Sequence, residues 1–214
     1  MNLEKQKEKL EKNWKKFAPK FGSKNWQEDP NFLYFIEIPL PTELWTDMEK
    51  LSYTLEKQSR LTGLWFPPQK MHITLALPAR KGSHFQANEL RFMEKTLKDI
   101  FQKIHVFEVI LGNLNCFADV LFREVWDETE TLYKLHHEIC SCIPFAQDPA
   151  YKLENYLPHI SLFLGKGDCD FLQNENFIRE IKPLKMKIEK IFLGRARNEE
   201  GKYERRILKE FVLK

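Results

Sequence analysis

The sequence predicts an α+β protein built as two pseudo-symmetric lobes, each with helices and one strand that carries the same short motif. The two motif segments, MHITLAL at residues 71–77 and PHISLFL at 158–164, are near copies of each other. Their histidines are 87 residues apart in a chain of 214 residues, and helical and strand patterns alternate around both. The two halves share little other sequence, so the expected symmetry is architectural. We expect the two motif strands to face each other across a central cleft.

The first half of the chain alternates between strand and helix patterns. An apolar stretch at residues 32–38 predicts a strand, and the prolines that follow it lead into a helix at 42–59. The first motif strand comes next, at 71–77. A Gly-Ser pair then marks a loop before a helix at 87–103.

The second half follows a similar order. Strands are expected at 106–111 and 120–125. Acidic residues at 127–130 open a helix that runs to about residue 142, because the N-terminus of a helix favours negative charge. The second motif strand and the remaining elements complete the chain: a strand at 159–164, a short helical stretch at 171–180, and strands near 184–193 and 204–213.

Each motif places an imidazole and a hydroxyl on the same face of its strand. Side chains alternate between the two faces of a strand with a period of two. His72 and Thr74 therefore point one way, and the odd-numbered apolar residues of their strand point the other way into a core. His159 and Ser161 repeat this arrangement in the second motif. A single His-x-Thr is common by chance in structural strands, but two copies in strand-like patterns favour a functional site.

These four side chains suit the cleavage of a phosphoester. Histidine titrates near neutrality, so His72 and His159 can serve as a base that accepts the proton of the attacking oxygen and an acid that protonates the leaving oxygen. Thr74 and Ser161 can donate hydrogen bonds to the non-bridging phosphate oxygens, where charge sits in the transition state. The scheme needs no metal and no cofactor. The near symmetry of the motifs leaves open which histidine is the base.

The paired His-x-(Thr/Ser) motifs resemble those of the two-histidine (2H) phosphoesterase superfamily, in particular the RNA 2',3'-cyclic phosphodiesterases once called 2'-5' RNA ligases. The resemblance extends over roughly residues 30–214. It includes a first strand and helix start at 32–41, the approaches to the two motifs at 65–72 and 156–159, and a closing hairpin at 194–213 with Tyr203 at its turn.

The resemblance implies a bilobal 2H phosphoesterase fold, with two antiparallel-sheet lobes, helices outside and a central cleft. It also implies a metal-independent phosphodiesterase that acts on a 2',3'-cyclic phosphate or on 2'-5' or 3'-end linkages of RNA. The sequence departs from the family pattern at one position. Close relatives often carry an arginine five residues after the second histidine, whereas this chain has Leu164 there, and the nearest cation is Lys166.

Candidate substrate contacts outside the motifs are Tyr34, Arg123, Phe163, Lys166 and Tyr203. The resemblance implies that the first strand, with Tyr34, lines the cleft. Arg123 sits between apolar neighbours and is expected either to reach phosphate or to form a salt bridge. Phe163 shares the alternation of His159, so it could stack on a nucleobase, with core packing as the alternative.

Two other functions remain open: a non-catalytic RNA- or nucleotide-binding module with the same fold, and an esterase of a small cyclic nucleotide. All four motif side chains are intact, which argues against a module that has lost catalysis. The product terminus left on a short RNA would separate the remaining possibilities.

Composition indicates a folded, soluble enzyme, with 43% hydrophobic and 13% aromatic residues. The sequence contains no apolar run near 18 residues and no apolar N-terminal leader. The four cysteines lack the spacing of a zinc site and are expected to be reduced thiols. We therefore expect a cytoplasmic protein (or a nuclear one in a eukaryotic host) that acts on RNA as a monomer, without membrane contact.

The net charge of +3 is unevenly distributed. Residues 1–24 hold eight lysines and three glutamates, and their apolar residues recur at helical intervals. We expect this segment to be a basic helical extension that precedes a single bilobal domain at 25–214. It either packs its apolar stripe on that domain or acts as an arm that contacts RNA phosphates.

Overall fold

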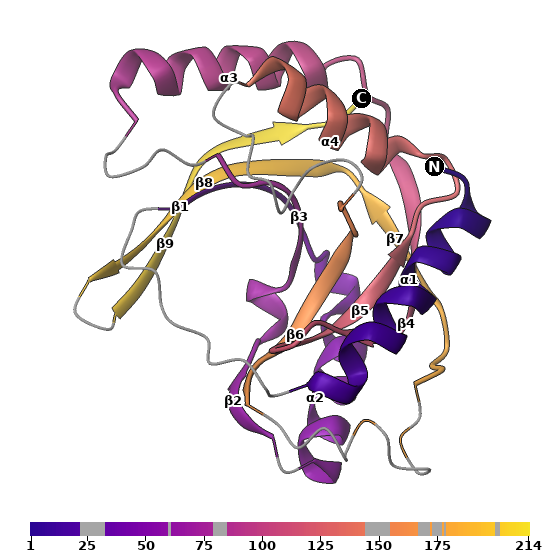
Figure 1. Ribbon diagram of the computed structural model, residues 1–214. Helices are drawn as coiled ribbons and strands as arrows, with labels where there is room; N and C mark the ends of the chain where they lie inside the picture. Colours follow the sequence, from indigo (N-terminus) through magenta and orange to yellow (C-terminus); the bar gives the residue numbers. More distant parts are fainter. Residues whose placement is uncertain are drawn as a thin grey trace.

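The chain folds around one long antiparallel sheet (Figure 1). The computed structural model describes residues 1–21, 33–59, 61–78, 85–143, 155–166, 172, 177, 179–199 and 202–214, with only the backbone described at 33, 166, 197–199 and 202–204. The α-helices of the described residues are α1 (Leu3–Phe17), α2 (Trp45–Gln58), α3 (Ala87–Phe101) and α4 (Thr131–Cys142). The strands are β1 (Leu33–Pro39), β2 (Thr62–Trp65), β3 (His72–Ala76), β4 (Phe107–Cys116), β5 (Val120–Trp126), β6 (His159–Lys166), β7 (Leu184–Ile188), β8 (Lys190–Glu199) and β9 (Lys202–Val212).

The two expected lobes are the two halves of this sheet. The strand order is β7-β4-β5-β6-β3-β1-β8-β9, with β2 paired to β6 at the side. Every strand pair is antiparallel. The halves meet where β3 pairs with β6, so the two motif strands are neighbours at the centre. The sheet curves strongly about this junction (Figure 1).

The expected strand at 184–193 is two strands that belong to different halves. β7 pairs with β4, whereas β8 pairs with β1 and β9. The buried apolar positions change phase at the break, from Met186 and Ile188 to Ile191 and Leu193. One residue, Glu189, between the two strands therefore carries the chain from one half to the other. The short strand β2 was not predicted, and the helical stretch expected at 171–180 lies largely outside the described residues.

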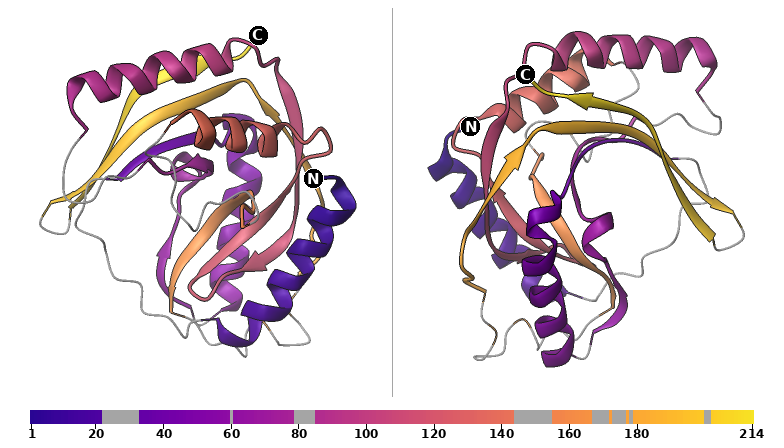
Figure 2. Two further views of the ribbon diagram at one scale, coloured as in Figure 1. Left: turned by 45° about the horizontal axis from the view of Figure 1, so that its top comes forward. Right: turned by 180° about the vertical axis from the view of Figure 1, so that it is seen from behind.

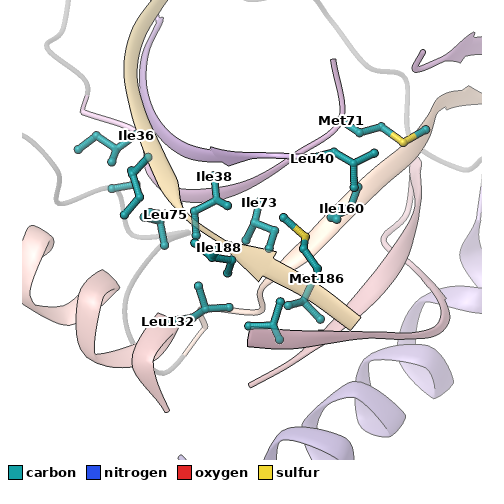
Figure 3. Close-up of a cluster of buried hydrophobic side chains, with 14 of the residues drawn as sticks. Ile36, Ile38, Leu40, Met71, Ile73, Leu75, Leu132, Ile160, Met186 and Ile188 are labelled. Atoms are coloured by element: carbon teal, nitrogen blue, oxygen red, sulfur yellow. The ribbon is translucent and has the colours of Figure 1, made fainter. Parts of the chain in front are cut away.

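One face of the sheet, here called the core face, holds the main hydrophobic cluster. Ile73 of β3 and Ile160 of β6 lie on it, and both are fully buried. Figure 3 shows these residues packed with Ile38, Met186 and Leu132 of α4. α3 joins the same cluster through Phe101, whose ring contacts Phe211 of β9 with centroids 5.1 Å apart. Helices α3 and α4 lie together across the β1–β3–β8–β9 half (Figure 1).

The opposite face, here called the motif face, carries the side chains of the two motif histidines and hydroxyls. Helices α1 and α2 lie on opposite sides of the β4–β5–β6 half, as the front and rear views show (Figures 1 and 2). Met48 of α2 is in the core cluster. Leu10 of α1 packs instead with Phe122 of β5 and with Leu157. Phe122 pairs with Ser161 in the β5–β6 register, so α1 covers part of the motif face.

Both ends of α1 are fixed by specific contacts. Asn2 caps the helix, since its side chain accepts a hydrogen bond from the Lys5 amide. Gln6 is fully buried and exchanges two hydrogen bonds with the backbone of Asp127, at 2.6 and 3.0 Å. Near the C-terminal end, the Phe17 ring meets the edge of Phe117. The apolar stripe of the N-terminal segment is therefore packed against the sheet.

Replacement of Leu10 by alanine is expected to lower the free energy of unfolding by about 2–5 kcal/mol, because it leaves a cavity beside Phe122. The exposed Lys12→Ala on the same helix is the control and should cost less than about 1 kcal/mol. Urea unfolding monitored by tryptophan fluorescence measures both changes. If the two variants were equally stable, α1 would not contribute to the packed domain.

Candidate active site

The pairing of β3 with β6 brings the four motif side chains to one place. Ile73 lies opposite Ile160 across the antiparallel pair. One step outward in this register, His72 lies across from Ser161, and Thr74 lies across from His159. All four are half-buried, whereas their strand neighbours on the core face are fully buried. Directly opposed residues of an antiparallel pair share a face and lie within side-chain contact range.

Both imidazoles are held by the same backbone contact. His72 Nδ1 lies 2.8 Å from the carbonyl oxygen of Lys70, and His159 Nδ1 lies 2.7 Å from that of Leu157. A carbonyl only accepts, so Nδ1 must carry the proton in both rings. The neutral tautomer then leaves Nε2 as an unprotonated acceptor in each. Each motif therefore presents a base at the same ring position.

Aromatic rings surround His159. Its imidazole meets Phe117, the residue after β4, edge-on at 5.1 Å and Phe122 of β5 at 4.8 Å between centroids. Burial, the largest cause, and a positive charge on nearby His72 together lower the pKa of His159 to about 4, against the opposing effect of the Leu157 carbonyl. His159 is therefore neutral at physiological pH.

A buried ion pair adjoins His72. The His72 side chain is 32% exposed. Burial lowers the pKa of His72, while the Lys70 carbonyl opposes that shift. The Nε2 atom lies 3.6 Å from Oε2 of Glu37, a carboxylate that is only 1% exposed. Glu37 is also ion-paired with Arg205 of β9. The two histidines thus have different surroundings although their motifs are alike.

The approach to each motif is braced from the core face. The Tyr156 hydroxyl donates a hydrogen bond of 3.1 Å to the backbone carbonyl of Thr74, and the ring of His136 of α4 stacks on the Tyr156 ring. His136 Nδ1 also bonds the carbonyl of Leu75 at 2.7 Å. These contacts fix β3 and the segment before β6 relative to each other.

Three of the expected substrate contacts are not brought to the motif face. Tyr34 lies on the same face of β1 as Ile36 and Ile38, in the core cluster, and is buried against Phe85, with ring centroids 4.7 Å apart. Arg123 pairs in register with Ile160 and so lies on the core face. It is 3% exposed and donates to the backbone carbonyls of Gly112 and Leu111, and burial lowers its pKa to about 10.

Phe163 is the third, since it is fully buried and packs against Trp65, with ring centroids 5.0 Å apart. The β5–β6 register shifts by one residue between Ser161 and Phe163, so the simple alternation from His159 does not continue to it. Lys166 and Tyr203 lie in β6 and β9, but their side chains fall outside the described residues.

Four residues of the site were not predicted from the sequence: Glu37, Phe117 and Phe122, which lie beside the histidines, and Arg205, which pairs with Glu37. Glu37 did leave a signal, because it is the one charged residue in an otherwise apolar strand of seven. Its alternation with Ile36 and Ile38 places it on the motif face. Arg205 reaches the site only through strand pairing, so nothing local in the sequence identifies it.

Among the described residues, no group of three or more His, Cys, Asp or Glu side chains is arranged to hold a metal ion. None of the helices among the residues that the structure describes is long and apolar enough to cross a membrane.

We expect His159 to titrate with a midpoint of about 4, well below the ordinary value of about 6.5. Phe122→Ala should admit water beside the ring and raise this midpoint. NMR of imidazole Cε1 resonances against pH measures both, with the urea-unfolded protein as reference. A His159 midpoint in the folded protein equal to that in urea would contradict the buried environment.

The sequence model of the family described as the 2'-5' RNA ligase superfamily matches residues 40–200 of the chain. Among solved structures, TT0787 of Thermus thermophilus is 17% identical, with a TM-score of 0.65 over 85% of this chain and 97% of that one. E. coli LigT, solved in complex with 3'-AMP, is 16% identical, with a TM-score of 0.62 over 87% and 99%.

A further structure, described as a phosphoesterase, is 16% identical, with a TM-score of 0.65 over 86% and 99%. These likenesses are of fold. No curated protein gives a significant match to the sequence. The family match covers most of the chain, including both motifs, and the chain therefore belongs to the 2'-5' RNA ligase superfamily of two-histidine phosphoesterases.

Proposed function

We propose that the protein is a metal-independent RNA phosphodiesterase that acts on a 2',3'-cyclic phosphate, or on a 2'-5' or 3'-end phosphodiester bond, by acid–base catalysis with His72 and His159. The register of β3 and β6 carries this proposal, because it opposes each motif histidine to the hydroxyl of the other motif. A phosphoryl group between the strands would meet an imidazole and a hydroxyl from each side.

The geometry supports a specific division of labour. One Nε2 atom accepts the proton of the attacking oxygen, which is water for a cyclic phosphate or a ribose hydroxyl for a linear ester. The other imidazole, protonated at Nε2, donates to the leaving oxygen. The hydroxyls of Thr74 and Ser161 donate hydrogen bonds to the non-bridging oxygens. The 3'-AMP bound to LigT, a relative in fold, is consistent with a ribonucleotide substrate.

One assay separates this proposal from the two other functions left open by the sequence, a non-catalytic binding module and an esterase of a small cyclic nucleotide. Wild-type protein is incubated with short RNAs that end in a cyclic phosphate, with 2'-5'- and 3'-5'-linked dinucleotides, and with a free cyclic mononucleotide. Cleavage of the RNAs in excess EDTA supports the proposal. Binding without any turnover would indicate a non-catalytic module, and cleavage of the mononucleotide alone would indicate an esterase of small cyclic nucleotides.

His72→Ala and His159→Ala should each reduce kcat by about 10²–10⁴ without loss of the fold, because each removes one proton-transfer group. The double variant should lose less than the product of the two single losses, since the groups act together. His137→Ala is the matched control, as His137 is exposed on α4. Near wild-type turnover in either motif variant would reject the two-histidine mechanism.

Thr74→Val and Ser161→Ala should each lower kcat by about 10²–10³, because each removes a donor to the phosphoryl oxygens. The pH optimum should stay in place, because neither change alters a titrating group. The exposed Ser141→Ala on α4 is the control. An unchanged rate in Thr74→Val would show that this hydroxyl serves only the strand.

A further inference from the structure

We infer that Glu37, paired with Arg205, makes His72 the proton donor and leaves His159 as the base, an assignment that rests on the proposed function. The two motifs alone do not distinguish the histidines. The strands that flank them do, because the two halves of the sheet carry different residues at equivalent positions.

The equivalent positions are defined by the register. Glu37 of β1 lies opposite Thr74, the residue two places after the first histidine. Phe122 of β5 lies opposite Ser161, the residue two places after the second histidine. The carboxylate of Glu37 comes within 3.6 Å of His72 Nε2, and the ring of Phe122 lies 4.8 Å from the ring of His159. The same position thus holds an anion in one half and a hydrocarbon in the other. Glu124 of β5 also lies opposite His159 in register, but its carboxylate accepts hydrogen bonds from Asn115 and Trp126 and pairs with Arg179.

These neighbours favour opposite protonation states. An anion within about 4–6 Å favours the charged form of an imidazole, whereas apolar burial favours the neutral form. The separation of 3.6 Å exceeds that of a good hydrogen bond, so Glu37 does not block Nε2 from a substrate. Burial lowers the pKa of both rings, but in the part of the chain that the structure describes only His72 has a carboxylate beside its Nε2 atom. His72 is therefore the histidine that holds a proton more readily, with Nε2 still available to a substrate, while His159 stays neutral.

The charges around His72 come from several elements. Glu37 faces it from β1, Arg205 reaches Glu37 from β9, and His159 lies on the neighbouring strand β6. His136 of α4 contacts β3 from the core face and bonds the Leu75 carbonyl. Glu37 is thus the anion in contact with the His72 ring among the described residues.

Stability does not account for the Glu37–Arg205 pair. A buried ion pair is generally no more stabilising than well-packed apolar residues of the same volume, and the other half of the sheet uses Phe122 at this place. The Arg205 guanidinium also packs over the Phe35 ring, with 4.5 Å to the centroid, which holds the carboxylate in position. This arrangement suits a group that positions a proton donor.

The proton balance follows directly. His159 Nε2 takes the proton of the attacking oxygen as that oxygen bonds to phosphorus. The bond from phosphorus to the leaving oxygen breaks, and that oxygen takes the proton of His72 Nε2. The enzyme ends with its proton on His159, and exchange with solvent restores the starting state.

The first experiment is the NMR titration of His72 in the absence of substrate, which does not depend on activity. Glu37→Gln should lower the titration midpoint of His72 by about one pH unit. Glu37→Asp, which keeps the negative charge, should leave the midpoint close to that of the wild type. Glu108→Gln, the same charge change at an exposed position on β4, is the control. A His72 midpoint that moves no more in Glu37→Gln than in Glu108→Gln would overturn the inference.

A double variant that removes both charges of the Glu37–Arg205 pair keeps the test valid if Glu37→Gln alone fails to fold. In Glu37→Gln the arginine is left without its partner, whereas Glu37→Leu combined with Arg205→Met removes both charges. The double variant also lacks the carboxylate, so the same fall of the His72 midpoint is expected. In the pH–rate profile, the alkaline limb should move to lower pH, because the donor loses its proton earlier.

The second experiment tests the roles with a nucleoside 3'-(4-nitrophenyl) phosphate, whose leaving group needs no proton. His72→Ala should recover most of the wild-type rate on this substrate, and His159→Ala should not. Recovery by His159→Ala instead would reverse the assignment. Absence of wild-type turnover on every phosphodiester would reject the proposed function, while the titration would still decide whether Glu37 controls His72.

Discussion

The pairing of β3 with β6 is the contact on which both the fold and the site depend. Among the described strands it joins the two halves of the sheet, and its register opposes Ile73 to Ile160 on the core face. A shift by one residue would turn the histidines and hydroxyls into the core and the isoleucines outward. Burial of these two isoleucines, both fully inaccessible, therefore fixes the positions of the catalytic candidates.

The motif face has to hold polar groups beside the apolar stripe of α1, and a network of hydrogen bonds makes this possible. Glu124 of β5 lies opposite His159 in register and is 2% exposed. It accepts hydrogen bonds from Asn115 and Trp126, and Arg179 pairs with it at 3.4 Å. Arg179 pairs in turn with Glu11 of α1. The basic N-terminal helix is thus joined to the strand next to His159 by charge as well as by apolar packing.

The sequence predicted what local periodicity determines and missed what strand pairing determines. Alternation within each strand places the histidine and the hydroxyl of a motif on one face and the apolar residues on the other, as the structure shows. In the sequence, the break between β7 and β8 at Glu189 is indicated only by a change of phase in the apolar positions. Phe163 takes the core-packing alternative, because it is fully buried against Trp65, and a register shift interrupts the alternation from Ser161. Arg205 is separated from Glu37 by most of the chain, so only the order β1-β8-β9 brings them together.

The charge balance of the site bears on the substrate. Relatives often place an arginine at the position of Leu164, which in this chain pairs with Leu64 and Val120. Among the described residues, the two arginines near the histidines, Arg179 and Arg205, are each paired with a buried carboxylate. Both guanidinium charges are therefore balanced by carboxylates, and the cation that the proposed mechanism brings to the phosphoryl group is one protonated imidazole. Under the proposed function, this single positive charge matches the single negative charge of a phosphodiester better than that of a phosphomonoester dianion.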